Sequence, residues 1–354
     1  MKRVISGILV MFVFLVCVVE VTGLEVESIK EITNPAEGVD YGMPMFTPDG
    51  RVIATTLQKG LVIMNIDGSN RRVIIDKGPK EIEDSDNEYY SISPDGIKVA
   101  FVTYPTEDAW ESYISVINVD GTGLRELTSF APKVRDEAPV WSPDGNKIVF
   151  HRIKNPGSKA SIVICTINVD GSNLIELTAS ISNTKFEYPV FSPDGTKIAC
   201  VKDWLEEGYK QRLYLMNIDG TGLKMVSNAA GGVVMKWSRD SKRIWNSGEM
   251  IDIVTNLVNR GNENGIISPD WQWVCGDEIK MGEGLSDDEV LEGTLFISGL
   301  SGQNKIKLPL IRNVWYKPYD WSSDGKMIIA VKGCGMSMPD ETGFPYTLVV
   351  IKLR

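Results

Sequence analysis

Apolar and polar residues alternate along this chain in short runs separated by turns, a pattern that predicts β-strands. One turn recurs. A bulky apolar residue is followed by Ser or Thr, Pro, Asp and Gly, and then by a second apolar run, as in residues 191–199. Close copies of the turn stand at 47–50, 93–96, 142–145 and 322–325, and altered copies at 238–241 and 268–271. Successive copies lie 30 to 54 residues apart, a period that indicates structural units burying their apolar faces against one another.

A second turn follows in the first four units, with the sequence Asp-Gly-Ser or Asp-Gly-Thr, at 67–69, 120–122, 170–172 and 219–221. Asp-Gly between two β-rich runs is a strong hairpin signal, because Gly accepts the positive φ that a tight turn requires. Each unit is therefore predicted to be a four-stranded antiparallel meander. Such units arranged radially make a β-propeller.

We predict an all-β fold, a seven-bladed β-propeller of four-stranded antiparallel blades, in a single domain of residues 24–354. Residues 26–33 read like the fourth strand of a unit, and the last repeat ends on a third strand. The N-terminal strand is therefore predicted to close the last blade. Because the fifth repeat has little room for its strands, six blades is the alternative. The repeats are predicted at 41–86, 87–135, 136–185, 186–231, 232–261, 262–315 and 316–353.

These motifs resemble the TolB-like β-propeller repeat, whose signature is Trp or Phe-Ser-Pro-Asp-Gly followed by an Asn-x-Asp-Gly-Ser turn. The resemblance covers residues 41–353 and implies the propeller fold. It implies less about function, because the same repeat occurs in envelope proteins, in propellers attached to serine peptidases and in some sugar lyases.

The first 23 residues differ from the rest of the chain. Lys2 and Arg3 precede an apolar run at 4–19, and polarity returns at Glu20. This predicts an export signal, with an uncleaved anchor that tethers the chain to a membrane as the alternative. We therefore expect a periplasmic or extracellular protein. The formal net charge of −10 argues against nucleic acid as a partner, because an acidic protein gains nothing from counterion release.

The residue inventory limits catalysis. His151 is the only histidine and there is no Gly-x-Ser-x-Gly motif, which argues against a Ser-His-Asp peptidase. The resemblance implies that a sugar lyase of this fold holds its metal with several histidines, which one His cannot supply. No two of the five cysteines form a Cys-x-x-Cys zinc pair, and whether any form a disulfide stays open. We expect no catalytic or metal-binding residues and no enzyme, with a carboxylate-pair glycosidase as the alternative.

Four glutamates stand five residues before the Ser of the recurring turn, where the innermost strands are expected to begin. Around a central channel they would focus a negative potential at its mouth. The predicted binding residues are Glu88, Glu137, Glu187 and Glu263, with Asp136, Tyr89 and Tyr188 beside them. The expected ligand is a basic, extended peptide, or a cation in the channel. The alternative is a solvated rim without a ligand.

From the sequence alone we therefore expect an exported, non-enzymatic TolB-like propeller that acts as a monomeric protein- or peptide-binding module of the cell envelope, without a cofactor. A glycan-binding or carboxylate-dependent glycan-active propeller is the alternative function.

Overall fold

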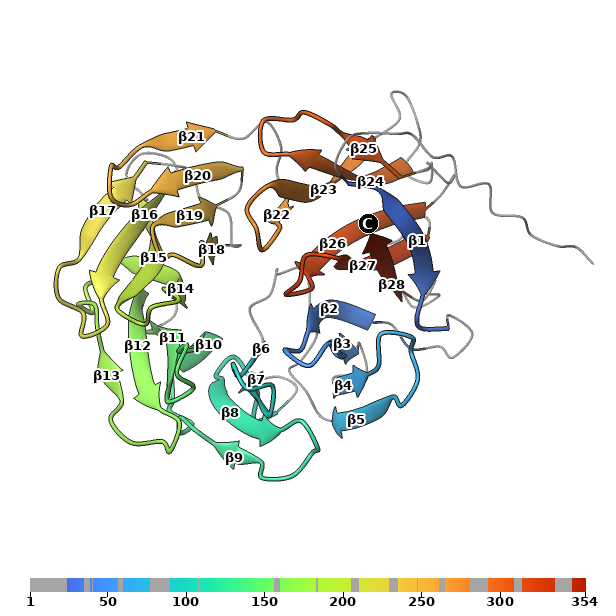
Figure 1. Ribbon diagram of the computed structural model, residues 1–354. Coiled ribbons are helices and arrows are strands. Elements are labelled where there is room, and N and C mark those ends of the chain that lie inside the picture. The colour runs from blue at the N-terminus through green and yellow to red at the C-terminus, as the bar shows by residue number, and fades with distance from the viewer. Residues whose placement is uncertain are drawn as a thin grey trace, which may run out of the picture.

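The computed structural model describes residues 24–34, 39, 41–56, 60–76, 90–106, 109–155, 160–182, 184–204, 210–228, 235–246, 248–260, 265–280, 292–308, 314–334 and 346–354. The regular elements in these residues are all β-strands. The sheets stand side by side around a central axis, with the first strand of each repeat innermost and the fourth outermost (Figure 1). The predicted leader lies outside the described residues. Within them, no helix has the length and hydropathy of a membrane span.

Five sheets have four strands each, in the meander order that the turns predict. The first is β2 (Tyr41–Phe46), β3 (Val52–Thr56), β4 (Gly60–Met64) and β5 (Arg72–Ile75). The second is β6 (Tyr90–Ile92), β7 (Lys98–Thr103), β8 (Tyr113–Asn118) and β9 (Arg125–Glu126). Two more are β18 (Met235–Trp237), β19 (Arg243–Asn246), β20 (Glu249–Asp252) and β21 (Val258–Arg260), and β22 (Ile266–Ile267), β23 (Trp273–Lys280), β24 (Glu292–Gly299) and β25 (Ile306–Lys307). The last is β26 (Val314–Trp321), β27 (Met327–Cys334), β28 (Thr347–Leu353) and β1 (Val26–Glu31).

The remaining eight strands form one continuous sheet, in the order β10-β11-β12-β14-β15-β16-β17, with β13 paired to β12. The strands are β10 (Val134–Trp141), β11 (Lys147–Lys154), β12 (Ser161–Asn168), β13 (Ile175–Glu176), β14 (Lys185–Phe191), β15 (Lys197–Trp204), β16 (Lys210–Asn217) and β17 (Lys224–Ser227).

This larger sheet overturns the predicted number of blades. Strands β12 and β14 are joined by a parallel pair between Ile162 and Lys185. Strand β12 can pair with β14 at Ile162 because β13 has only two residues and covers β12 only at Cys165 and Thr166. The prediction of seven separate four-stranded blades is wrong, and so is the alternative of six. The described strands form five sheets of that kind beside the eight-stranded one.

The N-terminal strand completes the last sheet, as predicted. Strand β1 pairs antiparallel with β28, in a register that runs from Val26 opposite Leu353 to Glu31 opposite Val349. Beyond the strand, the backbone N–H of Leu348 donates to the Thr33 hydroxyl over 2.9 Å. The two ends of the described chain are thereby hydrogen-bonded to each other, which covers the outer edge of β28.

The recurring Ser-Pro-Asp-Gly turn closes through its own side chains. In the copy before β15, the Ser192 hydroxyl donates to the Asp194 carboxylate over 2.6 Å and accepts the N–H of Lys197 over 2.9 Å. Gly195 has φ 69°, a left-handed conformation that glycine adopts without strain. The motif therefore fixes the connection between the first and second strands of a repeat.

The bulky residue before each turn packs between neighbouring sheets. Trp141 is buried, and its indole N–H donates to the carbonyl oxygen of Ser91 over 3.2 Å. Trp321 makes the equivalent bond to Ile266, also over 3.2 Å. The largest core cluster joins buried residues of three neighbouring sheets, including Ile53, Phe101 and Phe150.

Three cysteines, Cys165, Cys200 and Cys275, are free thiols buried in the core. Burial raises the pKa of Cys165 and of Cys200 to about 12. These thiols behave as small apolar side chains, and no disulfide joins any of the three.

Candidate functional site

Three innermost strands carry the same irregularity near their start. The register of β2, β10 and β14 shifts between Gly42 and Met45, Glu137 and Val140, and Glu187 and Val190. The residue after Gly42, Glu137 or Glu187 has a left-handed backbone, with φ 44° at Met43, 52° at Ala138 and 53° at Tyr188.

Each of these left-handed residues precedes a proline, at positions 44, 139 and 189. A non-glycine residue in this conformation costs about 1–3 kcal/mol, and a following proline restricts its backbone further. A bulge of this kind changes the direction in which side chains point. At Glu137 and Tyr188 it accompanies a group of interacting polar side chains from neighbouring repeats.

Glu137 is the centre of that group. It is 6% exposed, and its carboxylate accepts hydrogen bonds from the Arg135 guanidinium on the same strand. Arg135 also donates to the Tyr104 hydroxyl over 2.9 Å and lies over the Tyr104 ring, 5.5 Å from its centroid. Tyr104 follows β7 in the neighbouring sheet, so the guanidinium connects two repeats.

His151 on β11 holds the other side of Glu137. Its Nε2 lies 3.4 Å from the Glu137 carboxylate, and its Nδ1 accepts the backbone N–H of Tyr188 over 3.5 Å. The rings of His151 and Tyr188 meet edge to face at 5.7 Å. Since Nδ1 accepts, the neutral ring carries its proton on Nε2 and donates it to Glu137. The histidine thus links Glu137 to the bulge of β14.

We call Tyr104, Arg135, Glu137, His151 and Tyr188 the mouth cluster. Burial acts to raise the pKa of Glu137, but the hydrogen bond from His151, the electrostatic interaction with His151 and the charge of Arg135 outweigh it, so the pKa is lowered. Glu137 is therefore ionised at neutral pH. Tyr104, Arg135 and Tyr188 are half-buried, so the cluster presents two tyrosines and an arginine to solvent.

Asp136 has a different environment from its neighbour Glu137. It is fully buried, and its carboxylate accepts two hydrogen bonds from the Arg152 guanidinium, at 2.6 and 2.7 Å. Its backbone carbonyl accepts the Ser112 hydroxyl over 2.9 Å. Both carboxylate oxygens accept hydrogen bonds from Arg152, so Asp136 connects β10 to β11.

The other residues predicted for the acidic mouth are only partly described. Glu187 is half-buried, at the position on β14 equivalent to Glu137 on β10. Glu88, Tyr89 and Glu263 lie outside the described residues. In the part of the chain that the structure describes, no three His, Cys, Asp or Glu side chains are grouped to hold a metal ion.

The sequence did not single out Arg135, Arg152 or Tyr104 as site residues. Arg135 carried a usable signal, because residues two apart on a strand share a face and Arg135 is two residues from Glu137. Tyr104 and Arg152 are brought to their carboxylates by pairing between strands and between repeats. Sequence spacing does not report such distances.

The family described as TolB beta propeller domain matches residues 58–264, more than half of the chain. This confirms the predicted resemblance. No curated protein matches the chain significantly.

Similar solved structures include enzymes. An oligogalacturonate lyase in complex with manganese matches with a TM-score of 0.65 and 13% identity, over 92% of this chain and 93% of that one. An oligogalacturonate lyase from Vibrio parahaemolyticus matches with a TM-score of 0.66 and 10% identity, over 93% of this chain and 96% of that one. A prolyl endopeptidase structure matches with a TM-score of 0.55 and 13% identity, over 89% of this chain and 50% of that one.

At these identities the likeness shows the fold alone. It nevertheless contradicts the expectation that the chain is not an enzyme, because lyases share the fold over more than nine-tenths of its length. That expectation was wrong in treating one histidine as sufficient to set catalysis aside. Carboxylate and tyrosine side chains also perform acid–base chemistry, and the mouth cluster contains both.

Proposed function

Because the chain belongs to the TolB β-propeller family, we propose that it is an exported binding protein that holds an extended segment of a partner protein at the mouth cluster. The observation that carries the proposal is the arrangement of Tyr104, Arg135 and Tyr188. These half-buried side chains come from three repeats and are held by hydrogen bonds or ring contacts.

Tyrosine and arginine are the residue types most enriched among the energetically dominant residues of protein interfaces, together with tryptophan. Anchors that are already ordered lose little conformational entropy when a partner binds. Arg135 is ordered by Glu137 and Tyr104, and Tyr188 by His151. The side chains of the mouth cluster are therefore already ordered in the absence of a ligand.

Charge favours a partner segment with at least one basic residue. Glu137 is ionised but is buried against Arg135 and His151, so the carboxylate nearer the surface is that of the half-buried Glu187, at the equivalent position on β14. The net charge of the chain is also −10, which speeds the approach of a basic partner. The partner proposed here is a protein or basic peptide, bound by a single copy of the chain.

Selection from a displayed peptide library tests this proposal, because the library samples many segments and the partner itself need not be identified. We expect the purified chain to enrich peptides that contain basic residues. Substitution Arg135→Ala or Tyr104→Ala should weaken binding of an enriched peptide at least tenfold, the loss typical of an interface anchor.

Arg51→Ala is the matched control for Arg135→Ala. Each arginine pairs with a carboxylate two residues away, and their side chains are 29% and 25% exposed. Arg51 precedes the second strand of its repeat and Tyr104 follows one, so the two sites lie at opposite ends of the strands. Equal losses in Arg51→Ala and Arg135→Ala, or no enriched peptide at all, would rule out the mouth cluster as the peptide site.

A glycan ligand is the second candidate, favoured by the guanidinium stacked on the Tyr104 ring and by the fold shared with oligogalacturonate lyases. An aromatic face packs against a sugar ring, and a guanidinium binds a uronate carboxylate. Incubation with oligogalacturonate, followed by ultraviolet absorbance of the unsaturated product, tests turnover, and titration calorimetry with the same oligosaccharide tests binding. Turnover that is lost in Tyr104→Phe would replace the peptide proposal with an enzymatic one.

Export belongs to the same proposal. The apolar run at 4–19 supports it, and whether that run is cleaved or retained as a membrane tether is read from the N-terminal sequence of the mature protein. A mature chain that begins near residue 24 would support release into the periplasm or the medium.

A further inference from the structure

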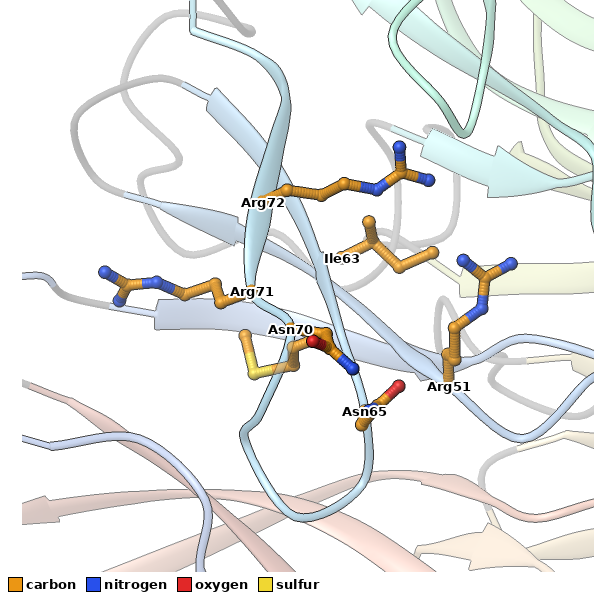
Figure 2. A pocket seen from close by; sticks show the side chains of 7 residues that line it. Arg51, Ile63, Asn65, Asn70, Arg71 and Arg72 are labelled. Atoms are coloured by element: carbon orange, nitrogen blue, oxygen red, sulfur yellow. The ribbon is translucent and has the colours of Figure 1, made fainter.

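A pocket of about 410 Å³ opens on the first sheet, at the ends of the strands opposite to those near the mouth cluster. Figure 2 shows its lining, in which Arg51 directly precedes β3, Ile63 lies near the end of β4, Asn65 directly follows β4, and Arg72 begins β5. Its volume suits a small molecule or the end of a side chain.

The equivalent space is occupied in the three repeats that follow. There, the lysine that begins the second strand donates from Nζ to the asparagine that ends the third. The bonds are Lys98–Asn118 at 2.6 Å, Lys147–Asn168 at 2.7 Å and Lys197–Asn217 at 3.1 Å. The same interaction in three repeats shows how the space is normally filled.

The first sheet lacks this lysine. Its turn is one residue shorter, since Thr47 bonds to the carbonyl of Arg51, four residues on, while Ser93 bonds to that of Lys98, five residues on. Arg51 turns instead to Asp49, at 2.7 Å. The Asn65 amide donates to Ser69 over 2.9 Å, and no lysine reaches its oxygen among the described residues. The pocket is the space that the lysine leaves.

The side chains around this space are basic. Figure 2 shows the guanidinium groups of Arg51 and Arg72 extending to the same side, while Arg71 extends to the other side. Arg71 is engaged by the Tyr41 hydroxyl. Arg72 is exposed, and among the described residues no hydrogen bond to its guanidinium is found. The Arg72 guanidinium interacts electrostatically with the Asp120 carboxylate of the neighbouring repeat, as the Arg51 guanidinium does with Asp49.

We propose that this pocket binds a small oxyanion, a carboxylate or a phosphate, between Arg51 and Arg72. A planar guanidinium presents paired N–H donors that match two oxygens of such a group. Asn70 lies at the rim of the same pocket, and its amide supplies a further donor. The oxyanion lies between the two guanidinium groups, beside the space that the lysine fills in the three following repeats.

Titration calorimetry of the purified chain tests the proposal, with inorganic phosphate and succinate as separate probes at an ionic strength fixed with sodium chloride. We expect at least one probe to bind. Arg72→Gln and Arg51→Gln should each weaken binding about tenfold or more, as the loss of a charge-assisted hydrogen bond predicts. The probe that binds identifies the oxyanion as phosphate or carboxylate.

Arg125→Gln is the matched control. Arg125 begins β9 as Arg72 begins β5 and is also exposed, but in its repeat Lys98 occupies Asn118. We expect this variant to bind within about twofold of the wild type, because general charge screening is equal in the two variants. Failure of both probes to bind, or an equal loss in Arg125→Gln, would overturn the proposal. Neither result affects the peptide experiment, which tests the other end of the strands.

Discussion

The ion pair between Asp136 and Arg152 should be among the most sensitive points of the fold. Asp136 has no exposed surface and Arg152 is 12% exposed, and their two hydrogen bonds are 2.6 and 2.7 Å long. Burial alone lowers the pKa of Arg152, but the hydrogen bond and charge of Asp136 outweigh it and the pKa is raised. The buried guanidinium of Arg152 is therefore stabilised by the Asp136 carboxylate.

Arg152→Met leaves the Asp136 carboxylate buried without a counter-charge. Breaking a buried ion pair in this way costs about 3–5 kcal/mol. For a chain of this size each kcal/mol corresponds to roughly 1.4 °C in Tm, so we expect a loss of about 4–7 °C. The measurement is thermal unfolding followed by circular dichroism, together with urea unfolding to obtain the free energy.

Two further variants make the reasoning refutable. Asp136→Leu combined with Arg152→Met should be more stable than Arg152→Met alone, because it removes the unpaired charge. Arg354→Ala, which breaks the exposed pair with Glu25, should cost less than about 1 kcal/mol. If Arg152→Met cost no more than Arg354→Ala, or if the double variant were no better than the single, the pair would not have the role assigned here.

Three other outcomes follow from the structure. The pKa of Glu137 is lowered from its ordinary value of 4.5, so its charge stabilises the fold above pH 4.5 and this contribution is lost as the pH falls through the lowered pKa. The difference in unfolding free energy between wild type and Glu137→Gln should therefore shrink when unfolding is measured at acid pH. Gly68→Ala should lower the free energy of unfolding, measured in urea, by at least about 2 kcal/mol, because the added Cβ would lie 1.9 Å from the Ile32 carbonyl oxygen. Gly50 has nearly the same φ but open space around it, so Gly50→Ala should cost only about 1 kcal/mol. Cys200, with a pKa raised by burial to about 12, should not react with a thiol reagent at pH 8 until the chain unfolds, and reaction in the native state would contradict its placement in the core.

The repeat in the sequence predicted most of the local structure. The Ser192 and Asp194 side chains close their turn within six residues, so the motif specifies the turn wherever it occurs. The number of sheets depended on a smaller effect. Ile162 and Lys185 are both strand residues, so their bridge merges two sheets. Ser112 and Arg135 form the same parallel bridge, but Ser112 precedes β8 and the sheets stay separate.

The contacts of the candidate site could be predicted only in part, for a similar reason. The spacing of Glu137 and Glu187 before their turns showed that they occupy equivalent positions. It could not show that Arg135 and His151 bind Glu137, because those contacts depend on pairing between strands and on the bulge after Glu137. The burial of Asp136 could not be predicted either, because the sequence shows that Asp136 is charged but not that Arg152 lies beside it.

Hydrogen–deuterium exchange of the chain with and without a peptide enriched from the library tests the central claim most directly. If the mouth cluster holds the ligand, amides of 134–141 and 185–191, the strands that carry Arg135, Glu137 and Tyr188, should exchange more slowly in the complex. Amides of 65–72, at the opposite ends of the strands, should be unchanged. Protection confined to 65–72, or no protection at 134–141 and 185–191, would contradict the account.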